Sequence, residues 1–182
     1  MSNNADPQKQ PEYQELANKL AAHFMVDAPK VVCTPMGPGV LGDTNPKTMT
    51  IRLNTDEQDA DSRLRPTRDV VLHEFTHVLL AHARPEYDGT HGKDFATKLN
   101  EVAKYHYSDP KEFSWASESS PASVVLAHDL GYLTDEAWVS SMADVVVAKM
   151  LHAGAIKQSD VKRIPMGVLM GWIKAATDMA RK

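Results

Sequence analysis

The stretch that decides the fold is Thr67–Ala83, which reads TRDVVLHEFTHVLLAHA. Its apolar residues lie around much of the circumference of a helix rather than along one stripe, a pattern typical of a helix that is buried on most sides. Pro66 precedes the stretch, and Thr67 is the expected N-cap. We therefore predict a central helix over residues 67–83. Within it stands the pattern His73-Glu74-Phe75-Thr76-His77, abbreviated HExxH.

The spacing of the two histidines has a mechanical reason. Residues four apart on a helix share a face and lie about 6 Å apart along its axis, so the imidazoles of His73 and His77 point to one place. A Zn²⁺ ion binds imidazole nitrogens at roughly 2.0–2.1 Å and fits between two such rings. Glu74 stands about 100° round the helix from His73, where its carboxylate can reach a water at the metal. The pattern predicts a zinc site with Glu74 as general base.

Two histidines leave a tetrahedral zinc site one protein ligand short. The best candidate for the third is His91, which we expect at the start of a helix over residues 90–107 that folds back over the first. The carboxylates of Asp88 and Asp94 are the alternatives for this position. His82 falls on the opposite side of its helix, so we expect it to point away from the metal.

Composition narrows the class of protein. Hydrophobic residues make up 42% of the 182 residues and charged residues 24%, which excludes a wholly disordered chain. The single cysteine, Cys33, excludes an internal disulfide and a cysteine-based zinc ribbon. A net charge of -4 argues against a protein whose whole surface binds nucleic acid, because phosphate binding needs a basic surface. The absence of a secretory signal and of a run of roughly 20 apolar residues predicts a cytoplasmic protein without membrane association, in the host cytoplasm if the protein is phage-encoded.

The remaining pattern suggests three parts: a flexible leader over residues 1–10, a catalytic core over 11–118 and a helical C-terminal segment over 119–182. In the core we expect a helix over 12–24, strands over 30–34 and 48–53, a short strand at 40–41 and a turn over 42–46. Residues 108–121, rich in Ser, Pro and acidic side chains, are expected to form a linker. The C-terminal helices are expected over 135–152, 159–163 and 165–181.

The histidines and their surroundings resemble a known family. His73-Glu74-x-x-His77, followed 14 residues later by His91-Gly92-x-x-Phe95, resembles the SprT-like metallopeptidases, which include the Spartan proteases. The resemblance covers residues 11–107 and includes the leading helix and the strand before the HExxH helix. It implies an α+β, zincin-like core with three histidine ligands (His73, His77 and His91), Zn²⁺ as the metal and a catalytic Glu74. In the best-known members the task is cleavage of proteins, including proteins crosslinked to DNA.

The chain departs from the family's pattern in two ways. The cysteine zinc ribbon common after the catalytic core is absent, and residues 121–182 form a helical segment in its place. The net charge is also acidic. The sequence therefore predicts a zinc-dependent metallopeptidase that hydrolyses an intracellular protein or peptide substrate. The alternatives are a non-proteolytic, zinc-containing interaction protein, with the C-terminal helices as its partner surface, and a DNA-associated protease that acts on DNA-bound proteins.

The group that would stabilise the oxyanion is left open by the sequence. Tyr105 follows His91 by 14 residues, or about 21 Å of helix, which is too far. Tyr87, in the loop between the two predicted helices, and Lys93 are nearer and are the two alternatives. The sequence does not predict an oligomeric state.

Overall fold

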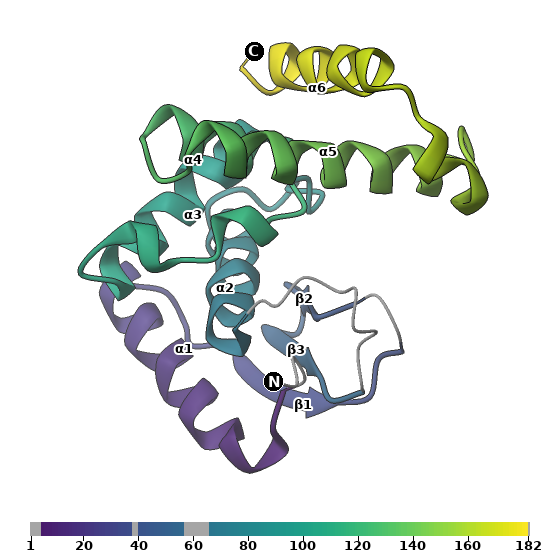
Figure 1. The fold of residues 1–182 in the computed structure, drawn as a ribbon. Coiled ribbons are helices and arrows are strands. Elements are labelled where there is room, and N and C mark those ends of the chain that lie inside the picture. Colours follow the sequence, from purple (N-terminus) through teal and green to yellow (C-terminus); the bar gives the residue numbers. More distant parts are fainter. Residues whose placement is uncertain (1–4, 38–39, 57–65, 182) are drawn as a thin grey trace. The chain divides into compact units, whose positions relative to one another are not determined.

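The computed structural model describes residues 5–37, 40–56 and 66–181 (Figure 1). The fold is α+β, as predicted: mostly helical, with one three-stranded sheet. The chain forms two compact units. Unit 1 comprises Met1–Thr90 and Lys98–Ser114, and unit 2 comprises His91–Thr97 and Trp115–Lys182. No helix in the described part of the chain is both long and apolar enough to span a membrane.

The sheet of unit 1 has the order β1-β3-β2. Strand β1 (Lys30–Thr34) runs parallel to β3 (Thr50–Asn54), and β2 (Gly42–Asn45) runs antiparallel to β3. The inward side chains of the two parallel strands, Val31, Ile51 and Leu53, are buried in the core.

Strand β2 lies where we predicted a turn, and the short strand expected at 40–41 is absent. The sequence Gly-Asp-Thr-Asn has low strand propensity, so the strand is set by its neighbours rather than by its own residues. Asp43 lies opposite Arg52 of β3, and their side chains form an ion pair across the two strands. Backbone pairing with β3 and this ion pair hold the register.

Helix α1 (Gln10–Phe24) covers the outer edge of β1 with two amide side chains. The Val31 N–H donates to Gln14 Oε1 over 2.8 Å, and the Cys33 N–H donates to Gln10 Oε1 over 2.9 Å. These bonds satisfy backbone groups that an edge strand would otherwise leave exposed.

The described part of the expected leader is packed against unit 1. Ala5 is 3% exposed, and its N–H donates to the Asn54 carbonyl at the end of β3 over 2.8 Å. A short 3₁₀ helix, η1 (Pro7–Lys9), then leads directly into α1. A polar composition predicted flexibility here, but one backbone bond to the sheet and a buried methyl group hold the segment.

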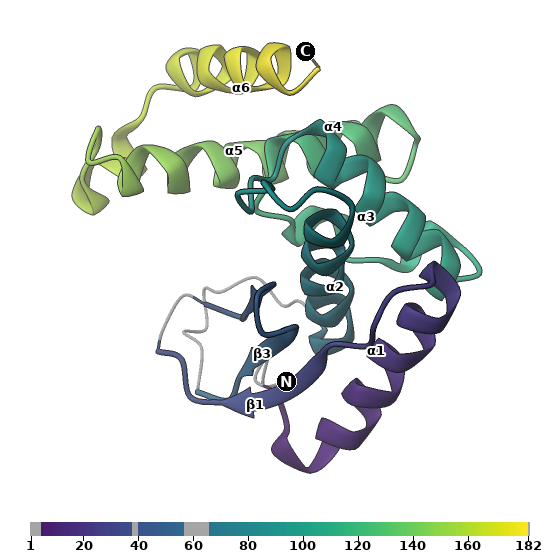
Figure 2. The ribbon, with the colours of Figure 1, turned by 180° about the vertical axis from the view of Figure 1, so that it is seen from behind.

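Helix α2 (Thr67–Ala83) has the predicted bounds, and it packs against α1 and the sheet (Figures 1 and 2). Eleven of its seventeen residues are buried, as expected for a helix that is apolar around most of its circumference. The predicted cap is wrong: Pro66 occupies the N-cap position with an extended backbone, and no side chain caps the helix. Asp69, in the first turn, adds a negative charge at the positive end of the helix dipole.

Helix α3 (Lys93–His106) begins later than predicted, so His91 lies just before it rather than in it. The second half of α3 belongs to unit 1 and is tied there by aromatic side chains. The Tyr105 ring stacks on His23 of α1 at 3.7 Å between centroids. The hydroxyl of Tyr107, the residue after the helix, donates to the buried carboxylate of Asp69, which also accepts the Ser114 N–H over 2.8 Å.

The segment expected to be a linker does connect the two units, because unit 1 ends at Ser114 and unit 2 resumes at Trp115, and it is ordered and partly buried. It contains the 3₁₀ helices η2 (Pro110–Glu112) and η3 (Trp115–Ser117). Phe113 is 2% exposed and Trp115 is 1% exposed. The order of the segment was not expected, because the linker prediction weighed its polar residues and not its two large aromatic side chains, which anchor it.

Unit 2 is built on three helices: α4 (Pro121–Asp129), α5 (Asp135–His152) and α6 (Met166–Ala180), with the 3₁₀ helix η4 (Gln158–Arg163) between the last two. Helix α5 has the predicted bounds, and Thr134 caps it by accepting the Ala137 N–H over 3.2 Å. Helix α6 runs back along α5 (Figure 2). The three helices share a core of apolar side chains: Val124, Val125, Met142, Val145 and Ile173.

Candidate metal centre

Three histidines come together in the structure. One ring nitrogen from each of His73, His77 and His91 lies within 4.8 Å of the others. Nitrogens bound to one zinc ion lie about 3.4 Å apart in tetrahedral geometry, so small side-chain adjustments bring the three onto a common ion. Three imidazoles suit zinc, copper, iron or nickel and not the hard cations calcium and magnesium. The donor set therefore fits a metal ion of the kind that the sequence predicts.

Helix α2 supplies two members of the group. His73 is buried, and His77 is half-buried one helical turn later, with 5.2 Å between the ring centroids. Both rings emerge from a helix whose other faces are packed, so the backbone beneath them is held rigidly.

The third member, His91, is held at its ring and at its backbone. Its ring meets Phe95 edge-on at 4.6 Å between centroids. Its carbonyl accepts a hydrogen bond from Ser120 Oγ over 2.6 Å. His91 thus reaches the group from an ordered loop, not from the first turn of a helix as expected.

The competing candidates lie outside the group. Among the described residues, the cluster of potential ligands includes neither His82 nor the carboxylates of Asp88 and Asp94. Asp88 Oδ1 accepts the Thr90 N–H over 3.0 Å, and hydrogen bonds from Thr90 hold the pKa of the Asp88 carboxyl below its usual value. Asp88 therefore shapes the loop that leads to His91.

Glu74 is buried next to His73 and is approached by the edge strand of the sheet. Thr44 Oγ1 of β2 lies 2.8 Å from Glu74 Oε2 and 2.9 Å from the Glu74 carbonyl oxygen. A hydroxyl in this position can donate to the carboxylate and restrict its orientation. The sequence did not reveal this partner, because Thr44 falls in a segment that we expected to be a turn.

Gly42 permits the close approach of β2 to α2. A Cβ atom at this position would lie 2.8 Å from Val70 Cγ1, 2.9 Å from the Arg52 carbonyl oxygen and 3.4 Å from Glu74 Cγ. The first two distances are too short for any side chain, so β2 lies this near the helix only because residue 42 has none.

Tyr87 lies beside His77 in the loop between α2 and α3. Its hydroxyl is 2.9 Å from His77 Nδ1 and 2.7 Å from the Thr90 carbonyl oxygen, and its ring stacks on the imidazole at 5.9 Å between centroids. Burial raises the pKa of Tyr87 to about 12, and the nearby carboxylates of Asp88 and Glu74 add to the rise while Arg84 opposes it. The phenol therefore keeps its proton at neutral pH.

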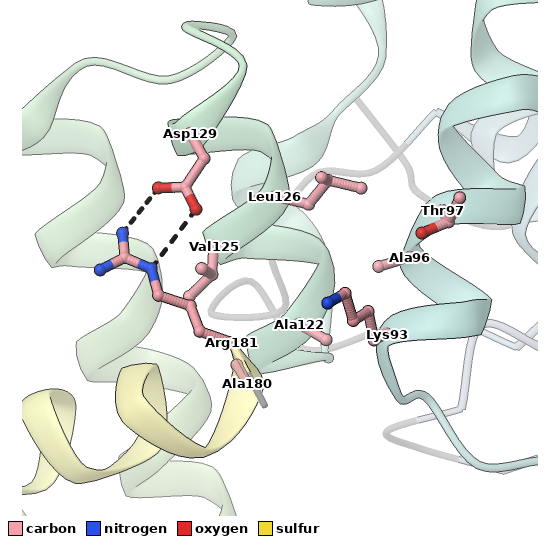
Figure 3. A pocket seen from close by; sticks show the side chains of 9 residues that line it. All are labelled: Lys93, Ala96, Thr97, Ala122, Val125, Leu126, Asp129, Ala180 and Arg181. Atoms are coloured by element: carbon pink, nitrogen blue, oxygen red, sulfur yellow. Dashed lines mark hydrogen bonds and ion pairs between the residues drawn. The ribbon is translucent and has the colours of Figure 1, made fainter.

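Lys93, the other residue considered for the oxyanion, lines a different hollow. This pocket of about 140 Å³ lies within unit 2, where Lys93 of α3 faces Ala122 and Val125 of α4 (Figure 3). An ion pair between Asp129 and Arg181, with 2.6 Å between the closest atoms, forms part of its wall. None of the three histidines lines this pocket.

Three residues around the centre were missed or misplaced by sequence reasoning. Thr44 and Ser120 fall in segments expected to be a turn and a linker, and nothing in the local pattern marks them. Tyr87 was considered only for the oxyanion. Its contacts with His77 and with the Thr90 carbonyl depend on how the loop folds against α2, which the sequence does not show.

Comparison with known proteins adds no further constraint. Neither a protein-family model, nor a curated protein, nor a solved structure matches the chain.

Proposed function

We propose that this protein is a zinc-dependent metallopeptidase that hydrolyses peptide bonds of a protein or peptide substrate. We propose further that residues 11–118, which contain all three histidines, form a zincin-like core of the SprT-like kind. The observation that carries the proposal is the convergence of three imidazoles at the face of a buried helix that also bears Glu74. Chance composition does not explain why His91, distant from the pair on α2, shares their location.

His73, His77 and His91 would hold the metal through one nitrogen each. When bound, zinc supplies a positive charge that polarises a peptide carbonyl and lowers the pKa of water toward about 7. Among the described residues, no fourth His, Cys, Asp or Glu belongs to the group. Three protein ligands with one position left for water or substrate are typical of catalytic zinc sites, whereas structural sites use four. This difference favours the enzyme over the non-proteolytic zinc protein.

Glu74 would act as general base and then as general acid. Its carboxylate accepts a proton from the attacking water as the new C–O bond forms at the scissile carbonyl. It then gives that proton to the amide nitrogen as the C–N bond breaks, so the peptide leaves as an amine. The Thr44 hydroxyl, 2.8 Å from the carboxylate oxygen Oε2, can restrict the orientation of this carboxylate toward the water.

The edge strand offers a place for the substrate. Within the described residues, β2 pairs only with β3, so its other edge presents backbone donors and acceptors. An extended peptide can add to such an edge as a further strand. Because Thr44 of the same strand touches Glu74, a peptide bound along β2 would pass the general base. We infer that substrates bind in an extended conformation.

No specific observation favours the DNA-directed alternative. The chain has two pairs of adjacent basic residues, at 162–163 and 181–182, and Arg181 is engaged in an ion pair with Asp129. Binding to single-stranded DNA that weakens steeply with salt would be the evidence for this alternative.

The proposal is tested by metal analysis of the purified protein together with a cleavage assay. The assay uses casein and a mixed peptide library, with and without a chelator, so that the result does not depend on one substrate. We expect about one zinc per chain and hydrolysis that the chelator removes and added zinc restores.

The Glu74→Gln variant separates metal binding from catalysis. It should keep zinc and lose hydrolysis by a factor of about 10²–10⁴, the usual contribution of a general base. Glu136→Gln, the same chemical change at an exposed position in the first turn of α5, is the matched control and should cleave normally. A zinc-loaded, folded wild-type protein that cleaves nothing, or a Glu74→Gln variant as fast as wild type, would refute the proposed function.

A further inference from the structure

The loop between α2 and α3 contains a tyrosine whose hydroxyl bridges two parts of the candidate centre. The Tyr87 hydroxyl lies 2.9 Å from His77 Nδ1 and 2.7 Å from the carbonyl oxygen of Thr90, the residue before His91. The Tyr87 N–H donates to the Arg84 carbonyl over 2.9 Å, which forms a turn that directs the ring toward α2. One side chain therefore contacts one candidate ligand and the backbone next to another.

The number of protons available fixes which group donates in each of the two hydrogen bonds of the Tyr87 hydroxyl. The phenol has one proton, and a carbonyl oxygen can only accept, so the phenol donates to Thr90. The second contact then requires a proton on the partner, which must be on His77 Nδ1. A neutral imidazole protonated at Nδ1 has its lone pair at Nε2, and that lone pair is what a metal binds.

We propose that Tyr87 is a positioning residue: it holds His77 in the Nδ1–H tautomer with Nε2 directed to the metal, and it fixes the backbone that leads to His91. A free imidazole in water favours the opposite tautomer, with the proton on Nε2, so this bond prepares His77 before any metal arrives. Partners that orient a metal-binding histidine in this way typically change metal affinity by about 10–100-fold.

Because its one proton is donated to Thr90, Tyr87 is not suited to the oxyanion role that the sequence left open. A group that stabilises an oxyanion must donate a proton to it. The only proton of this hydroxyl is already directed to Thr90. Tyr87 would have to release Thr90, and with it the loop before His91, to serve the substrate.

The test starts with the wild-type protein free of metal. Long-range ¹H–¹⁵N correlation spectra of the ¹⁵N-labelled protein report which ring nitrogen of each neutral histidine carries the proton, and a His77→Gln spectrum assigns the signals. We expect His77 to be protonated at Nδ1. A signal from the Nε2–H tautomer would overturn the proposal, whatever the protein does with zinc.

The Tyr87→Phe variant provides the second measurement, because it keeps the ring and removes only the hydroxyl. We expect the His77 signals to shift toward the Nε2–H tautomer and zinc affinity, measured by competition with a chromophoric chelator, to fall about 10–100-fold. Tyr105→Phe is the matched control, since that phenol lies on a ring stacked against His23. Unchanged tautomer and unchanged affinity in Tyr87→Phe would overturn the proposal.

The affinity measurement rests on the proposed zinc function, whereas the tautomer measurement does not. If the wild-type protein shows the Nδ1–H tautomer but binds no zinc, the role of Tyr87 toward His77 stands and the proposed function fails. If zinc binds and cleavage occurs while His77 carries its proton on Nε2, the function stands and the role of Tyr87 fails. If Tyr87→Phe does not fold, the wild-type spectrum alone decides.

Discussion

Helices α2 and α6 are both rich in apolar residues, yet they have opposite environments. Eleven of the seventeen residues of α2 are buried, whereas only Ile173 and Thr177 are buried among the fifteen of α6. Met166 and Met179, near the two ends of α6, are 69% and 68% exposed. Apolar composition is therefore enough to predict a helix, but the elements that surround it decide how much of it is buried.

The polar residues of the two helices differ more sharply. Thr76 of α2 and Thr177 of α6 are both buried, and both donate back to the carbonyl one turn earlier. The ionisable residues Lys174 and Asp178 of α6 pair with each other on the surface, with 2.6 Å between them. Of these two helices, α2 alone buries ionisable groups, namely Asp69, His73 and Glu74, and such groups need polar partners. Buried ionisable groups, rather than apolar content, distinguish the helix that bears two histidines of the candidate centre from α6.

The largest expected effect concerns the packing of α2. Phe75 is fully buried beside the HExxH histidines, and its replacement in Phe75→Ala should lower the free energy of unfolding by about 3–5 kcal/mol because it removes a large buried ring and leaves a cavity. Urea denaturation followed by circular dichroism measures this loss. A loss below about 1 kcal/mol would mean that α2 is less tightly packed than its burial indicates.

A smaller effect is expected where a buried charge of α2 meets its partner. Tyr107→Phe removes the hydroxyl that donates to Asp69 and leaves only the Ser114 N–H on that carboxylate among the hydrogen bonds described above. We expect a loss of about 1–3 kcal/mol at neutral pH. Comparison of the two proteins by urea denaturation at pH 7 checks it, and equal stability would contradict the role given to this bond.

The same pair predicts a pH dependence. Burial, and then the bond to Asp69 and the charge of that carboxylate, raise the pKa of Tyr107 above its ordinary value near 10. The folded protein thus holds the phenolic proton more tightly than the unfolded chain does. This part of the stability is present below about pH 10 and is lost as the pH rises above it. In denaturation curves, the advantage of wild type over Tyr107→Phe should be constant from pH 7 to about pH 9 and should shrink progressively above about pH 10.

The smallest effect is expected in α6. Met179→Ala removes a side chain that is 68% exposed, so the free energy of unfolding should change by no more than about 0.5 kcal/mol. Denaturation under the conditions used for Phe75→Ala makes the comparison direct. A loss above 1 kcal/mol would show that this face of α6 is covered in solution. The two helices would then both be buried, and they would differ only in what covers them.

The sequence predicted those elements whose own residues determine them. Helices α2 and α5 and strand β1 have the predicted bounds because periodicity, a cap or a β-branched run lies within each segment. Strand β2 could not be predicted, since Gly-Asp-Thr-Asn forms a strand only against β3. The burial of Phe113 and Trp115 likewise depends on distant residues.

The candidate centre was predictable to a similar degree. Helical spacing brings His73 and His77 together, and the structure places His91 with them. Their role as ligands, and that of Glu74 as base, stays a prediction. The supporting bonds from Thr44, Tyr87 and Ser120 could not be read from the sequence, because each joins segments separated by the course of the chain.

The absence of a side chain at Gly42 sets the distance between strand β2 and helix α2. Every other residue would push the edge strand outward from Val70, and the hydroxyl of Thr44 would retreat with it from the carboxylate below. The size of the side chain at position 42, which has no functional group of its own, would then change the activity proposed for Glu74. A search for altered activity should therefore begin with graded substitutions at this glycine.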